Sequence, residues 1–430
     1  MRVLGVGETC DLGALYLSLK AEGHEVRVAV SHPLAQGTLA GLIERAPDWR
    51  TQLGWVREAG SEGLILFESV SAGLGALQDQ LRREGFQVIG GSAYGDRLEN
   101  DRTYAQAVLA ELGFPRGHVW SFPTAEAASA FVDGRPGRYV LKRSGAGHAS
   151  SDTYVGELPD GRDVLAMLAA ADPGGGPLVL MDFIDGVEMG VGAYFNGSEF
   201  IRPACLDWEH KRFFPGDVGE LTGEMGTVVT YRGGERMFDQ TLSRLAPLLR
   251  DSGYCGYINL NTIVNDDGIW PLEFTCRFGY PGFPILDSLH CSGWDQIFRS
   301  LIKRDGNPFP TRDGYSVGVV ITVPPFPYSH GYDTLGKGRP ICFTGELSEA
   351  DRNAFHYGEV DMRDGQLVTA GMIGYIMVVT GVADSIKTAR ETAYNRVRKV
   401  VIPNSRYRND IGVRLIEHDM AELRRLGVIS

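Results

Sequence analysis

The chain has 430 residues, 43% hydrophobic and 22% charged, a mixture typical of a globular protein with about two to four packed units. Its formal net charge of −12 argues against nucleic-acid binding, because nucleic-acid binders usually carry a basic face or stripe. Six scattered cysteines without a C-x-x-C pair, no signal-peptide pattern and no apolar run of membrane-spanning length predict a cytoplasmic protein with reduced thiols.

The first hundred residues alternate between short apolar strands and helices. Residues 1–8, 26–30, 63–67 and 86–91 have the pattern of strands, and leucines at helical spacing follow two of them. This alternation predicts a doubly wound, mainly parallel sheet. Gly5 and Gly7 resemble the start of a dinucleotide-binding turn, but the third glycine of that fingerprint would be at position 10, which is Cys10. We therefore reject a nicotinamide cofactor.

The middle of the chain has the pattern of an α+β unit with antiparallel strands. Asn100 is predicted to cap a helix whose inner face carries Tyr104, Val108 and Leu112. Asn196-Gly197 and Asp267-Gly268 are hairpin turns between apolar runs. The apolar residues of 238–249 indicate one helix, kinked at Pro247.

The last third begins near residue 314 with an apolar strand. A second apolar run covers 372–381, and Ile386, Ala389, Ala393 and Val397 follow at the spacing of a buried helix face. This block is predicted to form a further, β-rich unit.

Lys142 ends a strand immediately before Ser144, Gly145, Ala146 and Gly147. A lysine and backbone amides without bulky side chains suit phosphate oxygens. The spacing does not match a Walker loop, and a surface lysine before a turn explains the pattern equally well.

Glu273 lies in the otherwise apolar run PLEFTC, and Thr275 points to the same face of that strand. A carboxylate there needs a partner, and a divalent cation or Arg277 would serve. Asp182 to Glu188 follow another apolar strand, where acidic residues often merely end the strand. The charges of 209–212 stand before a glycine-rich segment at 219–226, although such a run is usually a solvated face.

Four motifs in the same order resemble phosphoribosylamine–glycine ligases, a family of the ATP-grasp superfamily. EHKR at 209–212 is similar to D-H-K-R, and LTGEMG at 221–226 to N-T-G-G-M-G. LEFTCRFGYP at 272–281 is similar to E-F-N-x-R-F-G-D-P, and RNDIGVRLIE near the end is similar to D-I-G-x-R-A-I. The resemblance extends over nearly the whole chain.

The resemblance implies an ATP-grasp fold in three parts. We expect an N-terminal pre-ATP-grasp α/β domain at 1–97, an ATP-grasp domain at 98–312 with a lid at about 115–182, and a small β-rich domain at 313–430. It implies a ligase that uses ATP with Mg²⁺ or Mn²⁺ to convert a carboxylate into an acyl phosphate, which an amine then attacks. A closed lid would exclude water from that intermediate.

The same resemblance implies roles for individual residues. Expected ATP-binding residues are Arg102, Lys142, Ser144, Gly145, Gly147, the hinge Asp182, Phe183 and Ile184, and Glu188. Expected metal ligands are Glu273 and Thr275, and expected catalytic residues are Lys211, Arg212 and Arg277. Expected substrate-binding residues are Gly7, Glu8, Glu209, Thr222, Gly223, Glu224, Met225, Gly226 and Tyr280.

Several departures from the family pattern concern the substrate region. Thr275 replaces an asparagine metal ligand, Arg102 a lysine, and Tyr280 an acidic residue. The N-terminal G-N-G-G-R-E-H is changed at 5–11, and G-P-E-x-P-L has become Phe67-Glu68-Ser69-Val70. The ATP-binding residues are thus better preserved than the substrate pocket.

These observations predict an ADP-forming carboxylate–amine ligase, monomeric or homodimeric, without a nucleic-acid or membrane partner. The carboxylate would be an amino acid such as glycine, and the amine phosphoribosylamine or a replacement for it. The alternative is an ATP-binding protein of the same fold that has lost turnover, and a nicotinamide-dependent oxidoreductase is the most distant reading.

Overall fold

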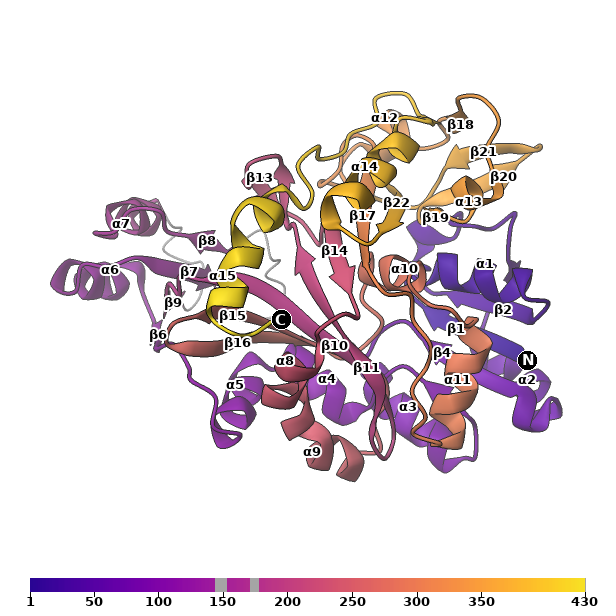
Figure 1. Cartoon of the computed structure of the whole chain (residues 1–430), viewed down its shortest axis with the longest axis horizontal. Coiled ribbons are helices and arrows are strands. Elements are labelled where there is room, and N and C mark those ends of the chain that lie inside the picture. Colours follow the sequence, from indigo (N-terminus) through magenta and orange to yellow (C-terminus); the bar gives the residue numbers. More distant parts are fainter. Residues whose placement is uncertain (144–152, 171–177, 430) are drawn as a thin grey trace.

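The structure is a computed structural model and describes residues 1–143, 153–170 and 178–429. Three sheets dominate it. The four-stranded sheet within the segment expected to form a lid is called the lid sheet, and Figure 1 shows it and the N-terminal sheet on opposite sides of a long central sheet. Within these residues no helix is both long and apolar enough to cross a membrane.

The N-terminal sheet is parallel, with the order β3-β2-β1-β4-β5. Its strands are β1 (Arg2–Gly7), β2 (Glu25–Val30), β3 (Glu44–Arg45), β4 (Gly63–Phe67) and β5 (Val88–Ile89). The helices α1 (Gly13–Ala21), α2 (Leu53–Glu58) and α3 (Leu74–Arg83) connect them. Val3 and Leu64 pack into the large core while Leu4 and Ile65 pack into a smaller one, so both faces are covered. The predicted doubly wound sheet is confirmed.

Two helices follow this sheet, α4 (Ala93–Asn100) and α5 (Arg102–Glu111). The expected cap at Asn100 is wrong, because Asn100 is the last residue of α4. The α5 cap is Asp101, whose side chain accepts a hydrogen bond from the Tyr104 amide at 2.9 Å.

The lid sheet is antiparallel, with the order β6-β9-β7-β8. Its elements are β6 (Val119–Phe122), α6 (Ala125–Gly134), β7 (Tyr139–Arg143), β8 (Tyr154–Val155), α7 (Arg162–Ala169) and β9 (Leu178–Asp182). Ala128, Val132, Val164 and Leu168 of the two helices close a small core of their own against it. The lid sheet therefore has a core separate from that of the central sheet.

The central sheet has eight strands in the order β16-β15-β10-β11-β14-β17-β22-β19. The strands are β10 (Val187–Asn196), β11 (Phe200–Glu209), β14 (Gly226–Thr230), β15 (Cys255–Asn265), β16 (Gly268–Thr275), β17 (Tyr315–Thr322), β19 (Phe355–Tyr357) and β22 (Tyr375–Ala383). The turns predicted at Asn196-Gly197 and Asp267-Gly268 join β10 to β11 and β15 to β16, so both hairpins are confirmed.

The strands after residue 312 continue this sheet, since β17 pairs antiparallel with β14. Helix α14 (Ile386–Val397) buries the four residues of its predicted inner face against β22 and β17. Smaller elements of this region are α12 (Tyr332–Leu335), α13 (Glu349–Arg352), β18 (Cys342–Phe343), β20 (Val360–Arg363), β21 (Gln366–Thr369), β23 (Val400–Val401) and α15 (Met420–Arg425).

The expected single helix over 238–249 is wrong. The segment forms α8 (Glu235–Gln240), a 3-10 turn at 242–245 and α9 (Ala246–Asp251), and the helical conformation is interrupted at Thr241. Pro247 lies in the first turn of α9, where its missing N–H is not needed. The apolar residues Phe238, Leu242, Leu245 and Leu249 are still buried, so the predicted inner face is kept.

Candidate functional site

A cavity of about 730 Å³ lies between the lid sheet and the central sheet. The lid sheet contributes Val119, Val140, Lys142 and Met181, and the end of β9 with the residues that follow it contributes Asp182 to Ile184. The opposite wall comes from strands β10, β11, β15 and β16, from residues 221–224, and from α10 (Gly282–Asp287). Segments distant in the sequence thus meet at one cavity.

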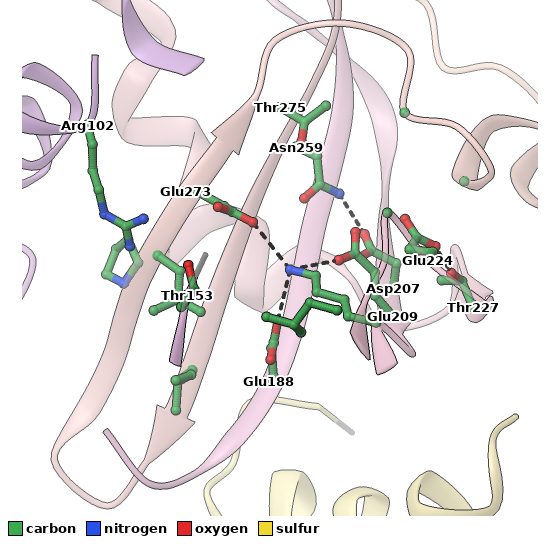
Figure 2. Close-up of a pocket in the computed structure, with 18 of the residues that line it drawn as sticks. Arg102, Thr153, Glu188, Asp207, Glu209, Glu224, Thr227, Asn259, Glu273 and Thr275 are labelled. Atoms are coloured by element: carbon green, nitrogen blue, oxygen red, sulfur yellow. Dashed lines mark hydrogen bonds and ion pairs between the residues drawn. The ribbon is translucent and has the colours of Figure 1, made fainter. Parts of the chain in front are cut away.

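Lys211 is held by three carboxylates from three strands. Its Nζ lies 3.2 Å from Glu188 Oε1, from Glu209 Oε2 and from Glu273 Oε1. Figure 2 labels these three glutamates and marks their ion pairs with dashed lines. Burial alone would lower the pKa of Lys211, but the three carboxylates raise it well above its ordinary value. Lys211 in turn lowers the pKa of Glu273. Positive charge is therefore required where these carboxylates converge.

Arg102, at the start of α5, and Lys142, on β7, line the same cavity. Burial and then the nearby Arg102 charge lower the pKa of Lys142 to about 8. Two cations on one wall repel each other, and an anion between them would relieve that repulsion. This wall has the chemistry of a site for phosphate oxygens.

The carboxylates of this region fit a hard divalent cation. Glu273 on β16 is opposite Asn261 on β15, and Thr275 is opposite Asn259. Carboxylate and amide oxygens are the ligands that Mg²⁺ prefers. Strand β15 thus places asparagine amide groups beside Thr275, which replaces an asparagine of the family pattern. The residues present therefore fit Mg²⁺.

The wall next to the hinge is apolar. Val119, Val140, Met181, Ile184, Ile263 and Leu272 line it. The Asp182 side chain is bound by His118. Its Oδ2 accepts a hydrogen bond from the His118 amide at 2.9 Å and lies 2.8 Å from Nδ1 of the His118 ring. An apolar slot of this kind suits a flat heterocycle.

Most of the expected site residues line the cavity. These are Arg102, Lys142, Asp182, Phe183, Ile184, Glu188, Glu209, Lys211, Thr222, Gly223, Glu224, Glu273, Thr275, Arg277 and Tyr280. Ser144, Gly145 and Gly147 lie outside the described residues.

Five other expected residues do not line the cavity. Met225 is fully buried in the core, and a Cβ at Gly226 would lie 2.5 Å from the Gly318 carbonyl oxygen on β17. Arg212 donates to the Gly219 carbonyl at 2.7 Å within the small hairpin of β12 (Arg212–Phe214) and β13 (Val218–Leu221). Gly7 packs against the buried Glu68, and Glu8 is exposed at the end of β1.

Sequence reasoning missed polar residues deep in the cavity. Asp207, Thr227, Tyr257 and Asn259 line it, with Gln106 and Thr153 elsewhere in the wall. Asn259 Nδ2 donates to Asp207 Oδ2 at 2.6 Å. A signal was available, since Asn259 and Asn261 alternate within the apolar run YINLNTIV just as Glu273 does within PLEFTC.

Comparison with known proteins gives two family matches. Residues 100–283 match the phosphoribosylglycinamide synthetase ATP-grasp (A) domain, and residues 316–414 match the C domain of the same enzyme. Together the matched ranges cover well over half of the chain.

Curated relatives and solved structures agree with these matches. The chain is 27% identical over 351 residues to a phosphoribosylamine–glycine ligase of Ralstonia nicotianae, covering 79% of this chain and 81% of the relative. It is 28% identical to that of Pseudomonas aeruginosa, covering 80% and 81%. The crystal structure of a phosphoribosylamine–glycine ligase from Thermotoga maritima superposes with a TM-score of 0.70 at 21% identity, covering 96% of this chain and 100% of that one. A biotin carboxylase from Campylobacter jejuni gives 0.61 at 14% identity, covering 99% and 98%.

Proposed function

The chain belongs to the phosphoribosylglycinamide synthetase family and is an ATP-dependent, amide-forming ligase with the ATP-grasp fold, and from this we propose which residues of the cavity carry the reaction. The observation that supports the assignment best is the Lys211 cluster, whose three carboxylates lie at 3.2 Å in the same cavity as Arg102 and Lys142.

We propose that the nucleotide lies between the lid and the central sheet. The apolar slot at Val140 and Met181 would receive adenine, backbone groups of residues 182–184 would bind its edge, and Glu188 would bind the ribose. Arg102 and Lys142 would bind the triphosphate, with Lys142 held as a cation by the phosphate charge.

Glu273 is proposed as the Mg²⁺ ligand, with Thr275 and the amide of Asn261 beside it. When bound, the metal neutralises the phosphate charge that would otherwise oppose transfer. Lys211, with its pKa held high by three carboxylates, stays protonated, orients them and supplies a fixed positive charge. Arg277 is fixed through its Nε, which donates to Glu99 Oε1 at 3.0 Å.

We propose that a small carboxylate attacks the γ-phosphorus of ATP, which forms an acyl phosphate and releases ADP. A neutral amine then attacks the acyl carbon, which forms the amide and releases phosphate and a proton. Glycine is the proposed carboxylate, and the amine is phosphoribosylamine or a replacement for it. Residues 221–224 and Tyr280, which line the cavity next to the Lys211 cluster, would bind these substrates.

The test is ADP release with ATP, Mg²⁺, glycine and freshly generated phosphoribosylamine, with mass spectrometry of the product. Release coupled to the mass of glycinamide ribonucleotide would establish both substrates. Release only with another amine would keep the ligase and change the acceptor. ATP binding without ADP release in any mixture would instead favour a protein that has lost turnover.

A further inference from the structure

The part of the cavity beside the Lys211 cluster is lined by buried acidic and polar side chains. These side chains, which we call the acidic floor, are Asp207, Glu224, Thr227, Tyr257 and Asn259. Figure 2 labels Asp207, Glu224, Thr227 and Asn259 beside the glutamates that bind Lys211. Two glycines of β10 make room for these side chains. A Cβ on Gly190 would lie 2.2 Å from Asp207 Oδ1, and one on Gly192 would lie 1.9 Å from the Tyr257 hydroxyl. The two glycines of β10 therefore leave room for the Asp207 and Tyr257 side chains.

Asp207 presents a carboxylate oxygen that lacks a donor. The residue is only 6% exposed, and its Oδ2 accepts from Asn259 Nδ2, but its buried Oδ1 has no hydrogen-bond partner among the described residues. Burial and then the charge of Glu209 raise the pKa of Asp207 to about 7. A buried carboxylate oxygen without a donor is costly, so this site is suited to a ligand that donates hydrogen bonds and carries positive charge.

Glu224 is the second buried carboxylate of the acidic floor, and the charge of Asp207 acts on it. It is 8% exposed, and the Thr227 hydroxyl donates to its Oε2. Burial, followed by the charge of Glu209, raises the pKa of Glu224 well above its ordinary value. Glu224 also occupies the second glycine position of the T-G-G-M-G motif, so the carboxylate is a departure from the family pattern.

The cations of the described cavity lining are already engaged. They are Arg102, Lys142, Lys211 and Arg277. The first two are assigned to the triphosphate, Lys211 is bound by three carboxylates, and Arg277 is paired with Glu99. A phosphate on the second substrate would therefore meet carboxylates at the acidic floor.

We propose that the acidic floor binds the amine substrate through a protonated amino group, so that the acceptor is an aliphatic diamine without a phosphate. An ammonium group has three N–H donors and no acceptor, which matches Asp207 Oδ1 and the Glu224 carboxylate. The second, neutral amino group of the same molecule is then the nucleophile. The inference rests on the proposed ligase function and names its acceptor class.

The experiment is calorimetric titration of the whole protein, saturated with Mg²⁺ and a non-hydrolysable ATP analogue. The probes are 1,3-diaminopropane and O-phosphoethanolamine, which differ in carrying a second ammonium or a phosphate. We expect 1,3-diaminopropane to bind more tightly. Asp207→Asn and Glu224→Gln should each weaken its binding about tenfold or more, since each removes a charge-assisted hydrogen bond. Asp239→Asn, the same chemical change at an exposed residue of α8, should leave binding unchanged.

Tighter binding of O-phosphoethanolamine, or equal affinity of 1,3-diaminopropane for the protein and for Asp207→Asn, would overturn the inference. A separate titration uses Mg²⁺ without nucleotide. If the protein binds Mg²⁺ and Asp207→Asn abolishes that binding, the acidic floor is a metal site and the inference is overturned. Unchanged affinity of each variant for the ATP analogue shows that the variant is folded.

The same series separates failure of this inference from failure of the proposed function. ADP release with glycine and phosphoribosylamine, with an unchanged KM in Asp207→Asn, would reject the acidic floor as the amine site and leave the ligase intact. No binding of the ATP analogue and no ADP release would reject the proposed function itself.

Discussion

At the scale of single residues, the balance of charge around Lys211 governs the site. One ammonium lies at the same distance from Glu188, Glu209 and Glu273, so three carboxylates share a single cation. A divalent cation arriving with the nucleotide would supply the missing positive charge. The cluster is therefore suited to take up metal and nucleotide together.

Glu273→Gln tests this balance. It keeps the size of the side chain and removes the charge, so we expect Mg²⁺-dependent ADP release to fall at least about a hundredfold, while the circular dichroism spectrum is unchanged. A coupled ADP assay over a range of Mg²⁺ concentrations measures the effect. Glu235→Gln, on the exposed surface of α8, is the matched control. Full turnover by Glu273→Gln would remove Glu273 from the metal site.

Asp207 predicts a pH dependence of stability. Its pKa is raised from 3.8 to about 7 in the folded protein, so the folded state holds a proton that the unfolded chain loses near pH 4. Its contribution to stability is thus present below about pH 4 and lost as pH rises through about 7. The asparagine of Asp207→Asn does not titrate. The melting temperature of this variant, relative to that of the wild type, should therefore rise as the pH increases from about 4 to about 7. Parallel melting curves over this pH range, recorded by scanning calorimetry, would contradict the prediction.

At the scale of elements, β10 acts as the base on which the cavity is built. Its neighbours β11 and β15 carry Asp207, Tyr257 and Asn259, and its own Gly190 and Gly192 leave room above it for the Asp207 and Tyr257 side chains. Side chains on adjacent strands reach into this space because residues paired in register lie on the same face of the sheet.

Gly190→Ala tests the role of this strand. The new Cβ would overlap the Asp207 carboxylate, so we expect a loss of about 1–3 kcal/mol in the free energy of unfolding and a weaker amine site. Chemical denaturation and the amine titration measure the two effects. Gly54→Ala in α2 meets no atom within 4 Å and should be neutral or slightly stabilising. An equal response of the two variants would contradict the proposed role of β10.

At the scale of the whole molecule, the C-terminal region completes the central sheet. Strand β17 pairs with β14. A later segment contacts His210, which is next to Lys211, because the Gly412 amide donates a hydrogen bond to His210 Nε2 at 3.1 Å. Burial keeps this histidine neutral by lowering its pKa to about 4. The EHKR and DIG motifs are thus in direct contact. The domain boundaries at 97 and 312 stay a prediction.

A chain ending at residue 312 should therefore fail to fold alone. It would expose the edge of β14 and the core residues Val228 and Leu206, which favours aggregation. Expression of residues 1–312 followed by size-exclusion chromatography, with the full chain as control, measures this. A soluble monomer with native-like cooperative unfolding would show that the central sheet is stable without β17.

The sequence by itself determined the family, the parallel N-terminal sheet, the two hairpins of the central sheet and the polar face of Glu273. These depend on local rules, namely the alternation of side chains along a strand, the turn preferences of Asn-Gly and Asp-Gly, and motifs of contiguous residues. Each of these rules depends on residues that are close together in the sequence, so it could be applied before the fold was known.

Only the tertiary structure decided what surrounds Lys211 and what forms the acidic floor. Lys211 meets Glu273, which is 62 positions away in the sequence, and Asp207 meets Asn259, which is 52 positions away. The break at Thr241 and the cap at Asp101 likewise follow from packing and capping geometry. Which strands become neighbours is set by burial of the whole core, and that balance has no local signature in the sequence.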